Sequence, residues 1–376
     1  MSREPAGPLT AHRSPLTVLI AGGGTGGHLM PALAIAEAVR RKHPEWRVVL
    51  VGATRGVEAS LLPTRTFPYE LLPAEPIYRR QWWKNFRWPM IGLRLVGAVD
   101  RLLDRERPAL VVGTGGYASG PVVWRAAGRA IPTAVQEQNA YPGLSTRLLA
   151  RRVREVWLGV PEARRHFKPG PRTAILDTGN PITPPDPSRR AAAFTRFGLD
   201  PRTPVLLVTG GSQGSLAINR AVAEWLGAGG AGAVQVLWAA GKATYPEFQR
   251  YHHPPAVQVF DFLDPMADAY SVANLAISRA GMMTIAELCA WGIPSILIPL
   301  PTAAADHQTP HAAVMAEAGA AVHLPQAGLT ATRLATILSG LLDSPVRVEE
   351  MARSARTRAR PDAVERISDR IGFLSG

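Results

Sequence analysis

Apolar residues fall along the chain in short continuous runs that alternate with stretches of helical spacing. The runs, rich in Val, Ile and Leu, predict strands at residues 16–21, 47–51, 109–113, 132–136, 154–158, 173–176, 205–209, 234–238, 257–260, 274–278, 295–298 and 321–324. The helical spacing predicts helices at residues 31–42, 90–104, 120–129, 143–152, 216–226, 265–272, 284–291, 308–318, 330–342 and 352–372. Near-continuous apolar strands separated by helices are typical of a parallel sheet covered on both faces, so the pattern predicts an α/β fold.

The two halves of the chain open in the same way. A strand runs into the glycine-rich stretch 22–28 in the first half and into 210–215 in the second, and a helical pattern follows each. Because 376 residues exceed what one core usually serves, we expect two Rossmann-like, doubly wound domains with a ligand cleft between them. We place them at 1–181 and 182–354, joined by a proline-rich hinge near 180–190 where a helix is not expected. A terminal helix at about 355–376 is a candidate to pack back on the first domain.

Four glycine-rich turns stand between a predicted strand and a predicted helix, at 22–28, 113–121, 210–214 and 279–284. Such a turn leaves backbone N–H groups at a helix N-terminus, which suits a phosphate group. The first turn lacks the Lys-Ser/Thr of the P-loop and the spacing of the dinucleotide fingerprint. Any one turn can be a tight turn without a ligand. Four of them at the carboxyl ends of parallel strands favour a phosphorylated ligand, and a diphosphate spread over both domains fits them.

Two side chains near these turns are candidates for chemistry. His28 stands where a Lys or a third Gly would be expected, and a neutral imidazole suits a general base that takes a hydroxyl proton. The alternatives are a helix-capping, a phosphate-binding or a packed histidine. Glu287 can hydrogen-bond vicinal ribose hydroxyls, or it can form a capping box with Thr284.

Two polar clusters follow predicted strands at the same sheet edges. The amides of residues 136–139, Gln-Glu-Gln-Asn, suit sugar hydroxyls or else satisfy backbone groups of their own loop. Residues 306–308, Asp-His-Gln, form the second cluster. His307 and His311 have helical spacing for a metal ion, but no acidic triad accompanies them, so we do not expect a metal site.

Composition indicates the compartment and the kind of partner. The chain is 46% hydrophobic, which fits a globular protein, and its one cysteine, Cys289, excludes an internal disulfide. Neither a secretory signal nor a spanning segment is visible, so we expect a cytoplasmic protein that does not cross the membrane. The formal net charge of +13 indicates an anionic partner.

The segment 77–91 combines five aromatic residues with four cations and contains no acidic residue. Aromatic rings favour the headgroup level of a bilayer and cations attract anionic lipid, so we interpret the segment as a peripheral docking patch for an anionic membrane surface. Burial under the next helix and a single-strand nucleic-acid platform are the alternatives, and we do not expect a nucleic-acid partner. The residues of this membrane patch are Tyr78, Arg79, Arg80, Trp82, Trp83, Lys84, Phe86, Arg87 and Trp88.

Several motifs in a fixed order carry a resemblance over nearly the whole chain. They are Gly-Gly-Thr-Gly-Gly-His at 23–28, Gly-Gly-Tyr-Ala-Ser-Gly-Pro at 115–121, Glu-Gln-Asn at 137–139, Gly-Asn-Pro at 179–181, Gly-Gly-Ser-Gln-Gly at 210–214, Phe-Leu-Asp-Pro-Met at 262–266, the run 279–287 and the region of Gln308. In this combination the chain resembles the MurG family of bacterial cell-wall glycosyltransferases.

The resemblance implies a GT-B fold whose second half holds UDP-N-acetylglucosamine and whose first half meets a lipid acceptor. The implied reaction is an inverting transfer of N-acetylglucosamine to the 4-hydroxyl of undecaprenyl-pyrophosphoryl-N-acetylmuramoyl-pentapeptide, which converts lipid I to lipid II in peptidoglycan synthesis. The implied enzyme is peripheral, at the cytoplasmic face of the membrane, and needs neither a metal nor another cofactor. Other cell-wall synthesis proteins are candidate partners.

The resemblance also implies roles for individual residues. Glu287 would hold the ribose, and His28 is the preferred base. The implied donor contacts are Thr25, Gly26, Gly27, Asn139, Ser212, Leu263, Met282, Met283, Thr284, Glu287 and Gln308. The implied contacts to the acceptor and the diphosphates are Gly24, Gly115, Gly116, Tyr117 and Ser119.

The chain departs from the family pattern at a few positions. Thr183 replaces an Arg that the family has two residues after Gly-Asn-Pro, so one contact to the donor diphosphate is either missing or supplied by another cation such as Arg189. His311 replaces an Asn, Gln136 replaces a His, and residues 280–284 read Ala-Gly-Met-Met-Thr instead of Ser-Gly-Ala-Leu-Thr.

Three other functions compete with this one. A related GT-B enzyme would use another nucleotide sugar or lipid acceptor. A nicotinamide-dependent oxidoreductase needs an acidic residue at the end of the second strand, which here reads Val-Gly-Ala-Thr at 51–54. A basic nucleic-acid-binding protein would bind with a steep salt dependence.

Overall fold

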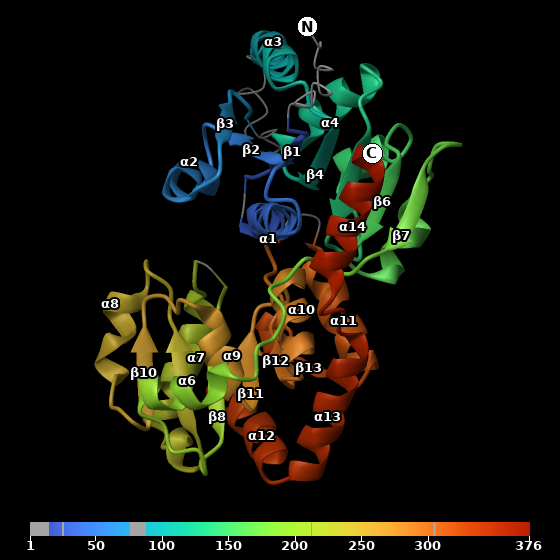
Figure 1. Ribbon diagram of the computed structural model, residues 1–376. Helices are drawn as coiled ribbons and strands as arrows, with labels where there is room; N and C mark the ends of the chain where they lie inside the picture. The colour runs from blue at the N-terminus through green and yellow to red at the C-terminus, as the bar shows by residue number, and fades with distance from the viewer. Residues whose placement is uncertain (1–14, 25, 76–87, 212, 304–305) are drawn as a thin grey trace, which may run out of the picture.

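The chain folds into two lobes, each built on one parallel sheet (Figure 1). The computed structural model describes residues 15–24, 26–75, 88–211, 213–303 and 306–376. We call the upper lobe in Figure 1 the first domain and the lower lobe the second domain. The two-domain, doubly wound α/β fold predicted from the sequence is confirmed.

The first domain holds a seven-stranded sheet in the order β3-β2-β1-β4-β5-β6-β7. Its strands are β1 (Thr17–Gly22), β2 (Arg47–Ala53), β3 (Tyr69–Leu72), β4 (Leu110–Gly115), β5 (Thr133–Glu137), β6 (Glu155–Leu158) and β7 (Ala174–Asp177). Its helices are α1 (Gly26–Lys42), α2 (Val57–Leu61), α3 (Trp88–Glu106), α4 (Ser119–Gly128) and α5 (Leu144–Leu149), with short 3₁₀ turns η1 (Leu62–Thr64) and η3 (Pro161–His166).

Helices cover both faces of this sheet because successive strand residues point to opposite sides. In β1, Val18 and Ile20 join one hydrophobic cluster with α1, whereas Leu19 and Ala21 join another with α3 and α4. Every residue of β1 is buried, as the continuous apolar run predicted.

The second domain holds a six-stranded parallel sheet in the order β10-β9-β8-β11-β12-β13. Its strands are β8 (Val205–Thr209), β9 (Gln235–Ala239), β10 (Val257–Phe260), β11 (Leu275–Ser278), β12 (Ser295–Leu297) and β13 (Ala321–His323). Its helices are α6 (Arg189–Phe197), α7 (Leu216–Gly227), α8 (Tyr245–Phe248), α9 (Met266–Val272), α10 (Met282–Trp291), α11 (Gln308–Glu317), α12 (Ala331–Leu342) and α13 (Pro345–Arg358), with 3₁₀ turns η4 (Gly230–Ala233), η5 (Gln249–Tyr251) and η7 (Gln326–Gly328).

The C-terminal segment forms two helices where the sequence predicted one at 352–372. Helix α13 ends at Arg358 and α14 (Ala363–Ser375) begins after Pro361. Proline lacks the N–H that would continue the helix, and it disfavours helical backbone in the residue before it, which explains the break.

Helix α14 packs on the first domain although it comes last in the chain (Figure 1). Ile367 and Ile371 are fully buried in the cluster that α1 forms with β1. At the edge of this contact Arg370 pairs with the carboxylate of Glu155, and Lys42 pairs with Asp369. The chain therefore crosses between the domains twice, once through residues 178–188 and once through 359–362.

Candidate functional site

The four glycine turns lie where the strand order of each sheet reverses. In the first sheet the neighbours β1 and β4 end in turns, and in the second sheet β8 and β11 do the same. Doubly wound sheets bind their ligands at such switch points. The first two turns touch, since a Cβ atom on Gly116, whose φ is +84°, would lie 1.9 Å from the carbonyl oxygen of Gly23. Only glycine fits at that position.

His28 lies in the first turn of α1, with its ring against the end of β4. Its Nδ1 is 3.2 Å from the carbonyl oxygen of Thr114 and 3.2 Å from Oε1 of Gln138. Both partners are acceptors, so in the neutral ring Nδ1 carries the proton and Nε2, which has no partner among the described residues, keeps its lone pair. A Cβ atom on Gly115 would lie 2.5 Å from Nδ1, so this glycine makes room for the ring. The ring is oriented to accept a proton at Nε2.

Glu58, at the start of α2, folds back on the first glycine turn. Its two carboxylate oxygens lie 2.8 and 2.9 Å from the amide nitrogen of Gly24, and Oε1 also accepts a hydrogen bond from the amide of Ala53 at 3.1 Å. Glu58 is fully buried, and side chains on Gly23 or Gly52 would collide with it. The Gly24 amide, a predicted diphosphate contact, is therefore already bonded to an internal carboxylate.

Glu137 organises the loop that follows β5. It accepts hydrogen bonds from the backbone and side-chain nitrogens of Asn139, at 3.1 and 3.0 Å, and from the amide of Gly143 at 3.1 Å. Gln136 and Gln138 are buried and hydrogen-bonded to groups of the same sheet edge. Within the predicted polar cluster, only Asn139 is partly exposed. Asn139 is therefore the one residue of this cluster whose side chain can still contact a sugar.

Arg279 braces the strand ends of the second domain. It is 9% exposed and donates to the backbone carbonyls of Ile298 and Pro299 at 3.2 and 3.0 Å. It also donates to Oγ of Ser215 and to Oε1 of Gln326, both at 2.7 Å. Because these groups occupy the guanidinium, Arg279 is a structural tie between four segments.

Glu287 lies in the second turn of α10, and the structure contradicts the capping box with Thr284, the alternative to ribose binding. The helix begins at Met282 with Gly281 as its N-cap, so Thr284 is already inside the first turn. Oε2 of Glu287 instead accepts a hydrogen bond from the hydroxyl of Tyr270 on α9, at 2.8 Å. Burial raises the pKa of Glu287 to about 7, and the Tyr270 hydroxyl opposes that rise.

His311 on α11 joins the two domains. Its Nδ1 donates to the carbonyl oxygen of Ala280 at 3.1 Å, and its Nε2 accepts from the amide of Ala140 at 3.2 Å. Both ring nitrogens of His311 therefore have hydrogen-bond partners. Neither is available to bind a metal ion together with His307, the possibility considered from the sequence. Among the residues that the structure describes, no three His, Cys, Asp or Glu side chains are grouped so that they could hold a metal.

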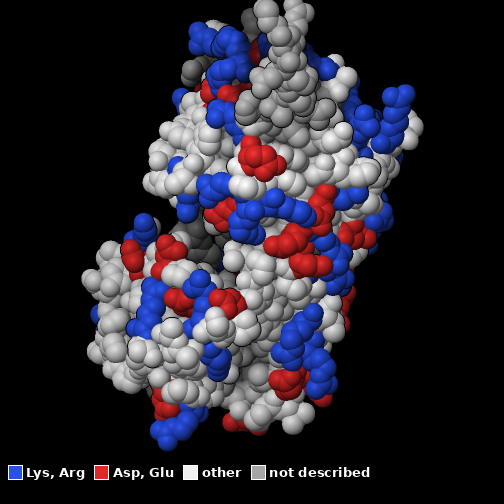
Figure 2. Space-filling view, in the orientation of Figure 1, with Lys and Arg blue, Asp and Glu red and all other residues white. Residues whose placement is uncertain are grey.

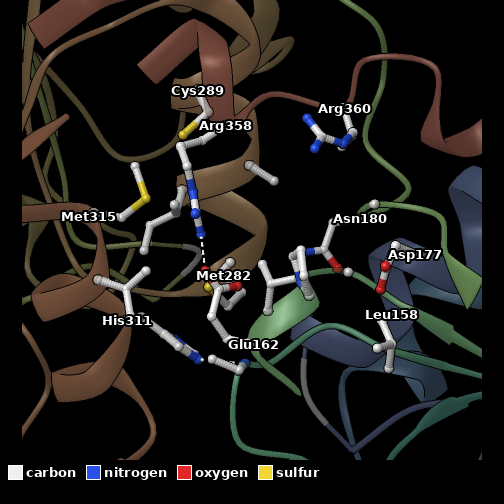
Figure 3. Close-up of a pocket in the computed structure, with 18 of the residues that line it drawn as sticks. Leu158, Glu162, Asp177, Asn180, Met282, Cys289, His311, Met315, Arg358 and Arg360 are labelled. Atoms are coloured by element: carbon white, nitrogen blue, oxygen red, sulfur yellow. Dashed lines mark hydrogen bonds and ion pairs between the residues drawn. The ribbon is translucent and has the colours of Figure 1, made fainter. Parts of the chain in front are cut away.

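A cavity of about 120 Å³ lies between the domains beside α10 (Figure 3). Met282 and Cys289 line it from α10, and Asn180 lines it from the first domain. Arg358 closes one wall by donating to Glu162 at 2.6 Å. The cavity lies on the Met282 and Cys289 side of α10, whereas Glu287 bonds to α9.

The remaining predicted contacts are placed as follows. Gly26 and Gly27 open α1 and are at least partly exposed, and Met283 and Thr284 are half-buried in the first turn of α10. Leu263 is buried before α9, and Oε1 of Gln308 accepts from the amide of Leu300 at 3.0 Å. The hydroxyl of Tyr117 donates to the carbonyl of Arg55, and Ser119 is buried at the start of α4. Thr25 and Ser212 lie outside the described residues.

The predicted membrane patch also lies outside the described residues, apart from the backbone of Trp88, where α3 begins. Along α3 the described side chains of Met90 and Leu93 are exposed. None of the described helices is both long and apolar enough to span a membrane. On the face in Figure 2, Lys and Arg are interspersed with Asp and Glu over both lobes.

Comparisons with known proteins identify the family to which this chain belongs. Residues 18–158 match the N-terminal domain of glycosyltransferase family 28, and residues 205–367 match its C-terminal domain. A relative from Porphyromonas gingivalis is 38% identical over 368 residues, or 96% of both chains, and one from Anaeromyxobacter dehalogenans is 40% identical over 94% of this chain and 92% of its own. Both are named UDP-N-acetylglucosamine–N-acetylmuramyl-(pentapeptide) pyrophosphoryl-undecaprenol N-acetylglucosamine transferase. The chain belongs to the MurG group of glycosyltransferase family 28.

Solved structures agree with this assignment. MurG of Acinetobacter baumannii is 26% identical and superposes with a TM-score of 0.74 over 96% of this chain and 99% of its own. The calicheamicin glycosyltransferase CalG4, 17% identical with a TM-score of 0.67, shares the fold over 96% of this chain and 98% of its own. The fold is therefore the GT-B fold of MurG, as the sequence motifs implied.

Arg189, the cation suggested as a substitute for the Arg that Thr183 replaces, forms an ion pair with Asp268 in this structure. Nη1 of Arg189 lies 2.8 Å from Oδ1 of Asp268 on α9, and Arg196 holds the other oxygen of the same carboxylate at 2.6 Å. Arg189 thus ties α6 to α9.

Sequence reasoning missed Glu58 and Tyr270 at this MurG site, and it missed the contact that His311 makes with the other domain. Glu58 had a readable signal in the glycines at 52 and 56, which leave room for a side chain that folds back between them. The bonds of Tyr270 to Glu287 and of His311 to Ala140 depend on how separate helices and domains pack. Residue spacing along the chain carries no information about them.

Proposed function

We propose that this protein transfers N-acetylglucosamine from UDP-N-acetylglucosamine to the 4-hydroxyl of undecaprenyl-pyrophosphoryl-N-acetylmuramoyl-pentapeptide, giving lipid II for peptidoglycan. One observation carries the proposal: relatives named for this transfer match 94% to 96% of the chain across both domains. The paired glycine turns at the switch point of each sheet support it, because they suit a nucleotide diphosphate.

The reaction is an inverting displacement. The acceptor hydroxyl attacks the anomeric carbon as the bond from that carbon to the UDP oxygen breaks, and the hydroxyl proton passes to a base. His28 fits that role, since its Nδ1 is anchored on Thr114 and its Nε2 lone pair is unpartnered within the described residues. UDP leaves with both electrons of the broken bond.

The donor lies on the second domain, with Glu287 holding the ribose diol and the first turn of α10 next to the diphosphate. Asn139 reaches the sugar from the first domain. Helix N-termini and turn amides take the charge of the leaving diphosphate, so the reaction needs no metal. Full activity in EDTA supports this part of the proposal, and restoration by Mg²⁺ after EDTA treatment contradicts it.

The enzyme works as a peripheral protein at the cytoplasmic face of the membrane, where its lipid substrate is held. The membrane patch at 78–88 supplies aromatic rings and cations for anionic lipid. Replacing Trp82, Trp83 and Trp88 with Ser should weaken sedimentation with phosphatidylglycerol vesicles and leave turnover of a short-chain acceptor unchanged. Retained sedimentation removes the patch from the proposal.

The deciding experiment is transfer of labelled sugar from UDP-N-acetylglucosamine to a short-chain lipid I analogue. A donor panel with UDP-glucose and UDP-N-acetylgalactosamine separates this proposal from a related enzyme with another donor. No transfer from any donor overturns the proposed function. Transfer only from another donor keeps the fold and reaction class and changes the substrate.

A further inference from the structure

We propose that Tyr270 is a positioning residue that fixes the orientation and the charge of Glu287 for the vicinal hydroxyls of the donor ribose. The inference deepens the proposed function and rests on it. Nothing in the sequence motifs assigns a role to this tyrosine.

The contact itself is direct. The Tyr270 hydroxyl donates to Oε2 of Glu287 at 2.8 Å. Oε1 of Glu287 makes no hydrogen bond to any residue that the structure describes. One carboxylate oxygen is therefore held by the protein and the other remains for a ligand.

Tyr270 is itself held rigidly. It is 4% exposed and packs in the core cluster of the second domain with Leu263 and Val272. Helix α9 is tied to α6 by Asp268, which pairs with Arg189 and Arg196. A rigid aromatic ring on a braced helix fixes the carboxylate without spending ligand-binding energy on ordering it.

The charged side chains near α10 are paired with one another, so the Tyr270 hydroxyl is the partner of the Glu287 carboxylate. From α9, Asp268 is neutralised by its two arginines. From α13, Arg358 is paired with Glu162 and Arg356 with Glu349. In the described part of the chain, Glu287 forms no ion pair with any of these side chains. Its ionised form, which accepts the ribose hydroxyls, is stabilised chiefly by Tyr270.

The burial that raises the pKa of Glu287 to about 7 makes this stabilisation measurable. The Tyr270 hydrogen bond lowers that pKa, so its removal raises the pKa further. Donor binding should then fall off at a higher pH than in the wild type. A purely structural role for Tyr270 does not shift this pH.

The test is binding of UDP-N-acetylglucosamine by calorimetry from pH 5.5 to 9 without acceptor, so that the base His28 takes no part. We expect Tyr270→Phe to weaken binding roughly tenfold near neutral pH, since hydrogen bonds to charged groups are among the stronger ones. We also expect the acid limb of the binding curve to move to higher pH. Tyr251→Phe, which loses the same atom elsewhere in the domain, should change neither.

A donor with 2′-deoxyribose completes the test. In the wild type the missing hydroxyl weakens binding, and in Tyr270→Phe this penalty should shrink because the two changes act on one carboxylate. The proposal is overturned if the 2′-deoxyribose donor loses the same affinity in the wild type and in Tyr270→Phe and the acid limb of the binding curve does not move. Should Tyr270→Phe not fold, Glu287→Gln tests the premise on which the role of Tyr270 depends: this variant should lose the acid limb, and an unchanged acid limb overturns the proposal. Failure of the proposed function shows separately, as absent binding of UDP-N-acetylglucosamine by the wild type.

Discussion

The Nε2 atom of His311 accepts the amide proton of Ala140, 3.2 Å away on the other domain. The same ring donates through Nδ1 to the carbonyl oxygen of Ala280. Burial lowers the pKa of His311 to about 4, so the ring is neutral at physiological pH and can accept at Nε2. One side chain thus ties the loop after β5 to the turn that opens α10.

Replacing His311 should lower turnover by misaligning the two domains. We expect His311→Leu to reduce kcat at least tenfold, because a loss of alignment across the cleft is costly. His311→Asn, which keeps one of the two bonds, should fall between it and the wild type. Steady-state kinetics with saturating donor measures both. A wild-type kcat in His311→Leu would show that the bridge has no role in alignment.

The His311 bridge also predicts a pH dependence of stability. A histidine whose folded pKa is lowered below its unfolded value of 6.5 contributes full stability above pH 6.5 and loses it as the pH falls toward 4. Thermal midpoints should therefore fall over this window more steeply in the wild type than in His311→Leu. Parallel curves for the two proteins would contradict the lowered pKa.

His28→Ala should remove the base and spare the donor site. General base catalysis contributes roughly 10²- to 10⁴-fold, so kcat should fall by that order. The affinity for UDP-N-acetylglucosamine should stay within about twofold, as the ring bonds Thr114 and Gln138 rather than the second domain. An unchanged kcat removes His28 as the base while leaving the fold untouched.

Gly116→Ala should abolish activity by forcing the first two turns apart. The added Cβ would meet the carbonyl oxygen of Gly23 at 1.9 Å. Gly229→Ala is the matched control: Gly229 also has a positive φ, of 86°, but open space around its Cβ. The control should lose only about 1 kcal/mol of unfolding free energy and keep its turnover. Similar losses of turnover in both variants would point to backbone strain and not to the contact.

Glu58→Gln should loosen the first turn without changing side-chain volume much. A neutral amide accepts more weakly than a carboxylate, and its NH₂ group faces amide donors. We expect the free energy of unfolding to fall by about 1–3 kcal/mol, measured by urea denaturation. Glu45→Gln, at an exposed carboxylate, serves as the control with no measurable loss.

The sheets could be predicted because their strands are buried on both faces and so leave a plain apolar signature. Strand β3, Tyr69–Leu72, was missed since it lies at the sheet edge and is only partly buried. Helix α6 was missed because its start at Arg189 lies within the proline-rich stretch assigned to the hinge.

The parts of the candidate site that could be predicted from the sequence are those that depend on local backbone conformation. The glycines at 115 and 116 indicate a tight turn already in the sequence, because backbone with positive φ favours glycine. The partners of Glu287 and His311 come from other helices or the other domain, and the local spacing of Thr284 and Glu287 suggested a cap that the helix start at Met282 excludes.

The position of helix α14 determines which domain can complete its core first during translation. Ile367 and Ile371 complete the core beneath β1, yet they are synthesised only after the whole second domain. The second domain, by contrast, has its whole sheet available before them. The apolar surface of the first domain that α14 covers therefore stays exposed during synthesis of the whole second domain, and the first domain can complete its core only once α14 has left the ribosome.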